Sequence, residues 1–202
     1  MKKTLAAAGL FLAAVTAGAQ VLDFTLTGPA GSGLLPGNEV PPSVGSTASG
    51  AASGPIQYDP ATQQLTFNIS YQGLSDAFSG AHIHGPATPA TTAGILYDLS
   101  ALGLVNQTSA TAGELLSPRS GTTLTLVNNP NGSGFDIPTQ VAQLQAGSWY
   151  INVHSAAGSG FPGGEIRGQL TPVPEPEQYA ALAGLALLGF AAYRRFSVST
   201  AV

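Results

Sequence analysis

Between residues 20 and 170, apolar and polar side chains alternate over short runs that turn-forming residues separate. The clearest run is 65–71 (LTFNISY), and a shorter one, 56–58 (IQY), precedes it across the turn 59–64 (DPATQQ). A period of two places successive side chains on opposite faces of a strand, so the two runs predict a β-hairpin. A chain dominated by such runs has to fold by burying sheet faces.

The rest of this region follows the same pattern. Further strands are expected at 22–26, 94–99, 122–127, 149–153 and 166–170. One helix is expected at 138–145, capped by Asp136 or Thr139 and ended by Gly147. The small-residue segment 47–54 (TASGAASG) fits either a closely packed strand or a flexible loop. Several short strands at this spacing predict an all-β fold, a single antiparallel sandwich or barrel-like domain over 20–170.

The N-terminal end has the features of a secretory signal peptide. Two lysines follow Met1, an apolar stretch covers 4–15, and Ala17-Gly-Ala19 is a small-x-small cleavage site. Signal peptidase would then remove residues 1–19. Gln20 would become the first residue of the mature chain.

The C-terminal end combines three segments. A Pro-rich linker (171–178) contains Pro174-Glu175-Pro176, an apolar run (179–193) predicts a helix, and a tail (194–202) opens with two arginines. The apolar run is shorter than the roughly 20 residues of a full membrane span, so a buried core helix or a permanent short anchor are alternatives. The preceding linker and the arginines argue against a core helix.

The three C-terminal segments together resemble a PEP-CTERM sorting signal, which an exosortase recognises. The resemblance implies export through the inner membrane of a Gram-negative bacterium and a transient membrane anchor formed by the hydrophobic, transmembrane helix 179–193. It also implies processing at Pro174, Glu175 and Pro176. The product would reach the cell surface or the extracellular matrix of a biofilm. Exopolysaccharide or matrix proteins would be its partners there.

Charge and cysteine content narrow the classes of function. Four of the six basic residues lie in the two ends, and 20–172 holds two arginines against eight acidic residues, a net charge of −6. Such an acidic domain is unsuited to binding a phosphate backbone, so no nucleic acid is expected as a partner. The chain has no cysteine, which excludes disulfides and thiolate metal sites.

Four segments of the β domain stand out by their wording and order. They are 35–42 (LPGNEVPP), 81–86 (AHIHGP), 146–155 (AGSWYINVHS) and 162–170 (PGGEIRGQL). Together they resemble the CHRD domain, first described in chordin and widespread in secreted bacterial proteins, over about 23–170. The departures are Ser155, where the family usually has Thr, and a longer connection after it. The resemblance implies an extracellular module without an established enzymatic activity, and it assigns no catalytic residue.

All three histidines of the chain lie in these segments. His82 and His84 are two apart on an expected strand, so both side chains point to one face, and His154 lies on another strand. Imidazoles from two strands suit zinc or copper, with Glu165 as a fourth ligand or as a partner of a ligand. A His-x-His strand also occurs in copper/zinc superoxide dismutases. The further metal histidines and the cysteines of that enzyme have no counterpart here.

The alternative is that these groups bond to one another without a metal. If 149–155 pairs antiparallel with 164–170, one register sets His154 opposite Glu165, with Asn152–Arg167 and Tyr150–Gln169 as further pairs. The polar face would then be a hydrogen-bonded network, with His82 and His84 bonded to carbonyls around 85–86. With only three histidines and no cysteine, the sequence favours the network over the metal site.

Two functions therefore stay open. One is a non-enzymatic binding or structural module of the cell surface or matrix. The other is a metal-binding protein or metalloenzyme that uses the His-x-His strand. No catalytic set is recognisable in the sequence: Ser155 adjoins His154, but neighbours on a strand point to opposite faces.

Overall fold

The computed structural model describes residues 20–158, 160–174 and 176–197. The expected signal peptide 1–19 with its cleavage site at Ala19, Glu175 of the expected processing site, and the end of the tail (198–202) lie outside the described residues. The strands are β1 (Leu22–Thr27), β2 (Ser49–Ala52), β3 (Ile56–Asp59), β4 (Gln64–Gln72), β5 (Phe78–His84), β6 (Ile95–Asp98), β7 (Val105–Gln107), β8 (Gly113–Ser117), β9 (Leu124–Thr125), β10 (Trp149–Ser155) and β11 (Ile166–Pro172). The helices are η1 (Pro36–Asn38), η2 (Pro130–Gly132), α1 (Ile137–Gln145) and α2 (Pro176–Ser197).

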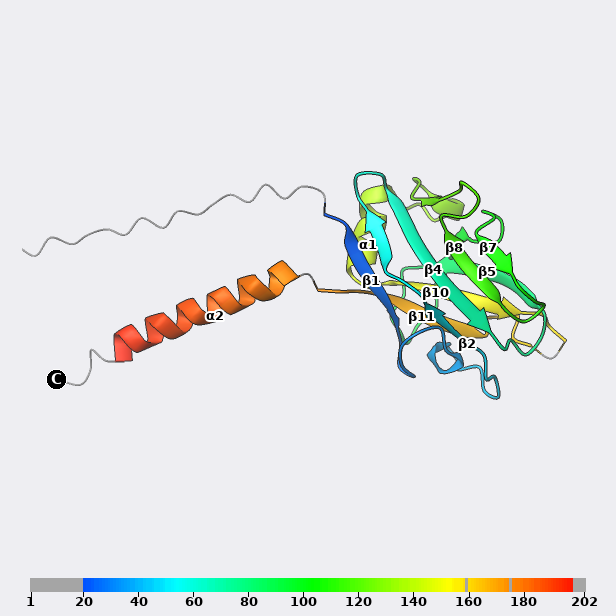
Figure 1. The fold of residues 1–202 in the computed structure, drawn as a ribbon, viewed down its shortest axis with the longest axis horizontal. Helices are drawn as coiled ribbons and strands as arrows, with labels where there is room; N and C mark the ends of the chain where they lie inside the picture. The colour runs from blue at the N-terminus through cyan, green and yellow to red at the C-terminus, as the bar shows by residue number, and fades with distance from the viewer. Residues whose placement is uncertain (1–19, 159, 175, 198–202) are drawn as a thin grey trace, which may run out of the picture.

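The strands form one curled antiparallel sheet, a half-barrel (Figure 1). Nine of them follow the order β6-β5-β10-β11-β1-β3-β4-β8-β7, and β2 and β9 pair with β4 outside this path. The mostly β class is therefore confirmed, but a sandwich of two separate sheets is not. The reason is the length of β4. Its nine residues pair with β3 and β9 near the start and with β2 and β8 further along, which joins all strands into one sheet.

Most of the expected elements are present. The hairpin of β3 and β4 is confirmed, as are β1, β6, β10 and β11, and the ambiguous segment 47–54 contains strand β2. The expected strand 122–127 shrinks to Leu124–Thr125, and strands β7 and β8 were not expected from the sequence. Helix α1 is capped by Asp136, whose carboxylate accepts a hydrogen bond from the Thr139 amide at 2.9 Å.

One face of β5, β10 and β11 forms part of the apolar core. Ile83, Trp149, Ile151 and Ile166 are among its fully buried side chains. Because side chains alternate across a strand, the residues between them form a second, polar face on the same three strands. This polar face carries all three histidines.

Loops cover much of the polar face. Arg167 of β11 is 1% exposed, and its guanidinium donates to the carbonyls of Thr88 and Thr91 in the loop that joins β5 to β6. On the other side, the Asn38 amide of η1 donates to the Arg167 carbonyl. Since buried polar groups need partners, these contacts fix the loops on the sheet.

Helix α2 projects from the end of β11, away from the sheet (Figure 1). It includes the run 179–193 that the sequence predicted as helical, and the side chains of Leu182, Leu188 and Phe190 are exposed. Within the described part of the chain, no helix is both long and apolar enough to span a membrane. The expected transmembrane helix is therefore not supported, since the apolar run is short and rich in weakly apolar Ala and Gly.

Candidate metal centre

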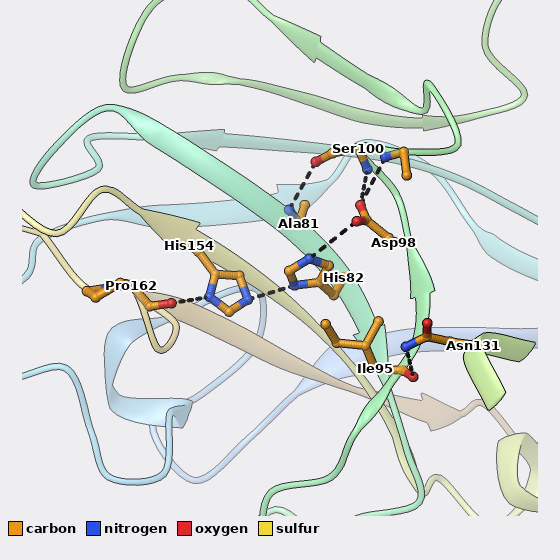
Figure 2. Close-up of polar contacts among 9 residues, drawn as sticks. Ala81, His82, Ile95, Asp98, Ser100, Asn131, His154 and Pro162 are labelled. Atoms are coloured by element: carbon orange, nitrogen blue, oxygen red, sulfur yellow. Dashed lines mark hydrogen bonds and ion pairs between the residues drawn. The ribbon is translucent and has the colours of Figure 1, made fainter. Parts of the chain in front are cut away.

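Three imidazoles meet on the polar face. His82 and His84 come from β5 and His154 comes from the neighbouring strand β10. One ring nitrogen of each lies within 4.8 Å of the other two. Figure 2 shows His82 and His154 facing each other across the two strands. The structure thus brings together the three histidines that the sequence proposed as ligands.

Backbone carbonyls fix two of the three rings. His154 Nδ1 lies 2.9 Å from the Pro162 carbonyl oxygen, and His84 Nδ1 lies 2.9 Å from the Ala93 carbonyl oxygen. A carbonyl can only accept, so both Nδ1 atoms carry the proton. In a neutral ring the lone pair is then on Nε2. For His84 that Nε2 is buried and has no hydrogen-bond partner among the described residues.

His82 contacts both His154 and Asp98. Its Nδ1 lies 2.9 Å from His154 Nε2, and its Nε2 lies 3.9 Å from Asp98 Oδ2 (Figure 2). Since His154 Nε2 holds a lone pair, the proton of the shorter contact belongs to His82 Nδ1. His82 is also the most accessible ring nearby, with a side chain that is 16% exposed.

The electrostatics of the site favour neutral imidazoles. Burial lowers the pKa of His84 to about 4, against a partial opposing effect of the hydrogen bond to Ala93. Burial also lowers the pKa of His154 and of His82, where the Asp98 carboxylate acts in the opposite direction. Neutral imidazole is the form that binds metals, so burial favours the charge state that a ligand needs at all three rings.

An aromatic stack supports the ring of His84. Tyr150 lies parallel to it, with an angle of 3° and 4.8 Å between the ring centroids. The Arg167 guanidinium lies 3.5 Å from the Tyr150 centroid. Because Tyr150 stacks on His84 and Arg167 packs on Tyr150, the His84 ring has little freedom to turn.

Glu165 is not part of the histidine cluster. Its Oε1 accepts hydrogen bonds from Ser46 and Ser75, and the group of potential ligands among the described residues consists of the three histidines. The assumed register is right for Tyr150–Gln169 and Asn152–Arg167, but strand β11 begins only at Ile166. Glu165 therefore lies before the ladder, where its side chain is held by other loops.

The predicted network is present only in part. Arg167 donates to Gln169, as expected for a network on this face, whereas the Asn152 amide donates to Glu39 rather than to a group of the two strands. His84 bonds to Ala93, further along the loop than the expected 85–86. Sequence reasoning missed Asp98, although it lies in the expected strand 94–99. Only the pairing of β5 with β6, which sets Asp98 opposite His82, makes it a neighbour.

The model of the CHRD domain family matches residues 30–170, well over half of the chain. This chain belongs to the CHRD domain family. The CHRD match includes β5, β10 and β11 and so contains the complete histidine cluster. No curated protein and no solved structure matches the chain significantly. The two ends of the chain lie outside the CHRD match.

Proposed function

We propose that this CHRD domain binds a divalent transition metal, Zn²⁺ or Cu²⁺, through His82, His84 and His154. The observation that carries the proposal is the buried Nε2 of His84, which has a lone pair but no hydrogen-bond partner among the described residues. An unpaired buried acceptor is costly, and a metal ion would supply its partner. One ring nitrogen from each of His82, His84 and His154 lies within 4.8 Å of the other two.

Small movements would complete the coordination. Zinc binds imidazole nitrogen at about 2.0–2.1 Å, which sets nitrogen atoms of a tetrahedral site roughly 3.3 Å apart. The distance between His82 Nδ1 and His154 Nε2 would lengthen slightly from 2.9 Å, and the longer nitrogen–nitrogen distances, up to 4.8 Å, would shorten. Three protein ligands leave a fourth position for water or for another molecule. Histidine ligands suit copper as well as zinc.

Two of the three ligands have the hydrogen bond that metal sites use to orient imidazoles, and the third faces a carboxylate. Metal-bound histidines generally donate their second ring N–H to a carbonyl or a carboxylate. Here the Ala93 and Pro162 carbonyls accept from His84 and His154, and the Asp98 carboxylate faces His82. A purely structural cluster does not require this arrangement at every ring.

The test is the metal content of the full chain, purified without a polyhistidine tag and reconstituted with zinc or copper. We expect about one ion per chain in the wild type and strongly reduced binding in His84→Gln and His154→Gln. Gln at position 84 keeps an N–H donor for the Ala93 carbonyl. Circular dichroism of the metal-free variants controls for folding. Less than about 0.1 ion per chain in the reconstituted wild type would overturn the proposal.

We further propose that the domain acts after export, as a binding or structural module at the cell surface or in the extracellular matrix. The support comes from the sequence of the two ends: the signal peptide 1–19 and the PEP-CTERM-like segment around Pro174 and Pro176. Signal peptidase and an exosortase would be the processing enzymes. Mass spectrometry of the secreted protein tests both cleavages, and intact ends would contradict this route. A gene deletion that leaves the matrix unchanged would contradict the matrix role.

A further inference from the structure

Two of the three imidazoles already have the tautomer that a metal needs, whereas His82 has the other one. Carbonyl groups hold the protons of His84 and His154 on Nδ1, which leaves Nε2 free to bind. In the metal-free arrangement His82 carries its proton on Nδ1 and donates it to His154 Nε2. That single hydrogen bond occupies two of the three potential ligand atoms.

Metal binding therefore requires a change at His82. For its Nδ1 to bind an ion together with His154 Nε2, the His82 proton has to move from Nδ1 to Nε2. The alternative, with His82 binding through Nε2, does not serve the same ion, because that nitrogen faces Asp98 rather than His154 (Figure 2). In that case the hydrogen bond from His82 Nδ1 to His154 Nε2 would also remain, and it would keep the His154 lone pair from the ion.

Asp98 is positioned to accept the relocated proton in a hydrogen bond. It lies opposite His82 in the register of β5 and β6, with Oδ2 3.9 Å from His82 Nε2. Its other oxygen, Oδ1, accepts hydrogen bonds from the amides of Ser100 and Ala101 at 2.9 and 3.0 Å. The turn after β6 thus holds the carboxylate in a fixed orientation, with Oδ2 directed to the histidine.

We propose that Asp98 is the positioning residue of the site, which stabilises the metal-binding tautomer of His82 by accepting a hydrogen bond from Nε2–H. This inference rests on the proposed metal-binding function and adds a residue that does not touch the ion. Carboxylate partners of this kind orient the ring and increase its basicity as a ligand. The side chain of Asp98 is 45% exposed, so the core does not depend on it.

The decisive variant is Asp98→Asn. Its carboxamide oxygen can still accept from the Ser100 and Ala101 amides, which keeps the turn and leaves the NH₂ group facing His82. An NH₂ group cannot accept from Nε2–H. We expect the affinity for zinc to fall by about 10- to 100-fold, the usual effect of removing such a partner.

Asp59→Asn is the matched control. The Asp59 carboxylate also closes a turn, accepting from the Ala61 amide and the Thr62 hydroxyl, but it lies in the β3–β4 hairpin, which β1 and β11 separate from the histidine strands. Zinc affinity is measured on the full chain by competition with a chromophoric chelator. The control should bind like the wild type. Equal affinities of Asp98→Asn and Asp59→Asn would overturn the role of Asp98.

A second measurement reports on the proton itself. Nitrogen-15 NMR of the zinc-loaded wild type should show His82 bound through Nδ1 and protonated on Nε2, the reverse of the metal-free form. Binding through Nε2 would overturn the inference even if affinities differ. A wild type that binds neither zinc nor copper would overturn the proposed function as well. Normal binding with an unaffected Asp98→Asn variant would overturn the Asp98 inference alone.

Discussion

At the scale of single residues, the polar face holds buried titratable groups with opposite pKa shifts. Glu39 is 6% exposed, and burial raises its pKa to about 7, although the Arg167 charge and the Val40 amide act against this. Burial lowers the pKa of His84 to about 4. Both shifts have one physical cause: burial disfavours the charged form of each group, the carboxylate of Glu39 and the imidazolium of His84. The two groups therefore make the stability depend on pH in opposite directions.

Glu39→Gln separates these two effects. A carboxyl whose pKa is higher in the folded state stabilises the fold below its unfolded pKa of about 4.5, and this contribution is lost as pH rises to about 7. Gln cannot ionise and still accepts from the Asn152 amide. Relative to the wild type, the variant should therefore gain roughly 2 kcal/mol of unfolding free energy between pH 5 and pH 8. Urea unfolding in the presence of a chelator measures this, and a pH-independent difference would contradict it.

At the scale of elements, the loop between β5 and β6 is the part of the fold that makes the site. Three of its carbonyls accept from two side chains of the sheet: Ala93 from His84, and Thr88 and Thr91 from Arg167. Tyr150 also contacts this loop through its hydroxyl, which accepts from the Ala93 amide at 3.2 Å. The orientation of His84 therefore depends on Arg167, which holds the loop, as well as on the stack with Tyr150.

Arg167→Lys should loosen this loop. Lysine keeps the positive charge but loses the planar fork that reaches Thr88, Thr91 and Gln169 together. We expect a loss of about 2 kcal/mol in unfolding free energy and weaker zinc binding, because Ala93 is held less firmly. Arg119→Lys is the control: Arg119 donates to the Gly103 carbonyl at an exposed position. Equal effects of the two substitutions would show that the loop does not depend on Arg167.

The strands could be predicted from the sequence better than the neighbours of the histidines could. Strict alternation identified β3, β4, β10 and β11, because burial of one face leaves a period of two in the side chains. Asp98 was not recognisable as a neighbour of the histidines. Nor were the carbonyls of Ala93 and Pro162, since a backbone acceptor leaves no trace in residue identity. Only the path of the loops brings these groups to the site.

At the scale of the whole molecule, the long strand β4 joins what the sequence suggested as a sandwich into one curled sheet. The strands that hold the histidines lie toward one end of it, where β10 pairs with both β5 and β11. An ion bound there would connect neighbouring strands. Its effect would therefore extend beyond the loops to the unfolding of the domain.

Zinc should raise the thermal stability of the whole domain. An ion that binds only the folded chain stabilises it by about 2.7 kcal/mol at a free concentration 100 times the dissociation constant. For a domain of this size that corresponds to a shift of roughly 5–10 °C in the unfolding temperature. Calorimetry should show the shift in the wild type and in Asp59→Asn, a smaller one in Asp98→Asn at the same zinc concentration, and none in His84→Gln. Because His84 is the buried ligand without another partner, a full shift in His84→Gln would mean that zinc binds elsewhere.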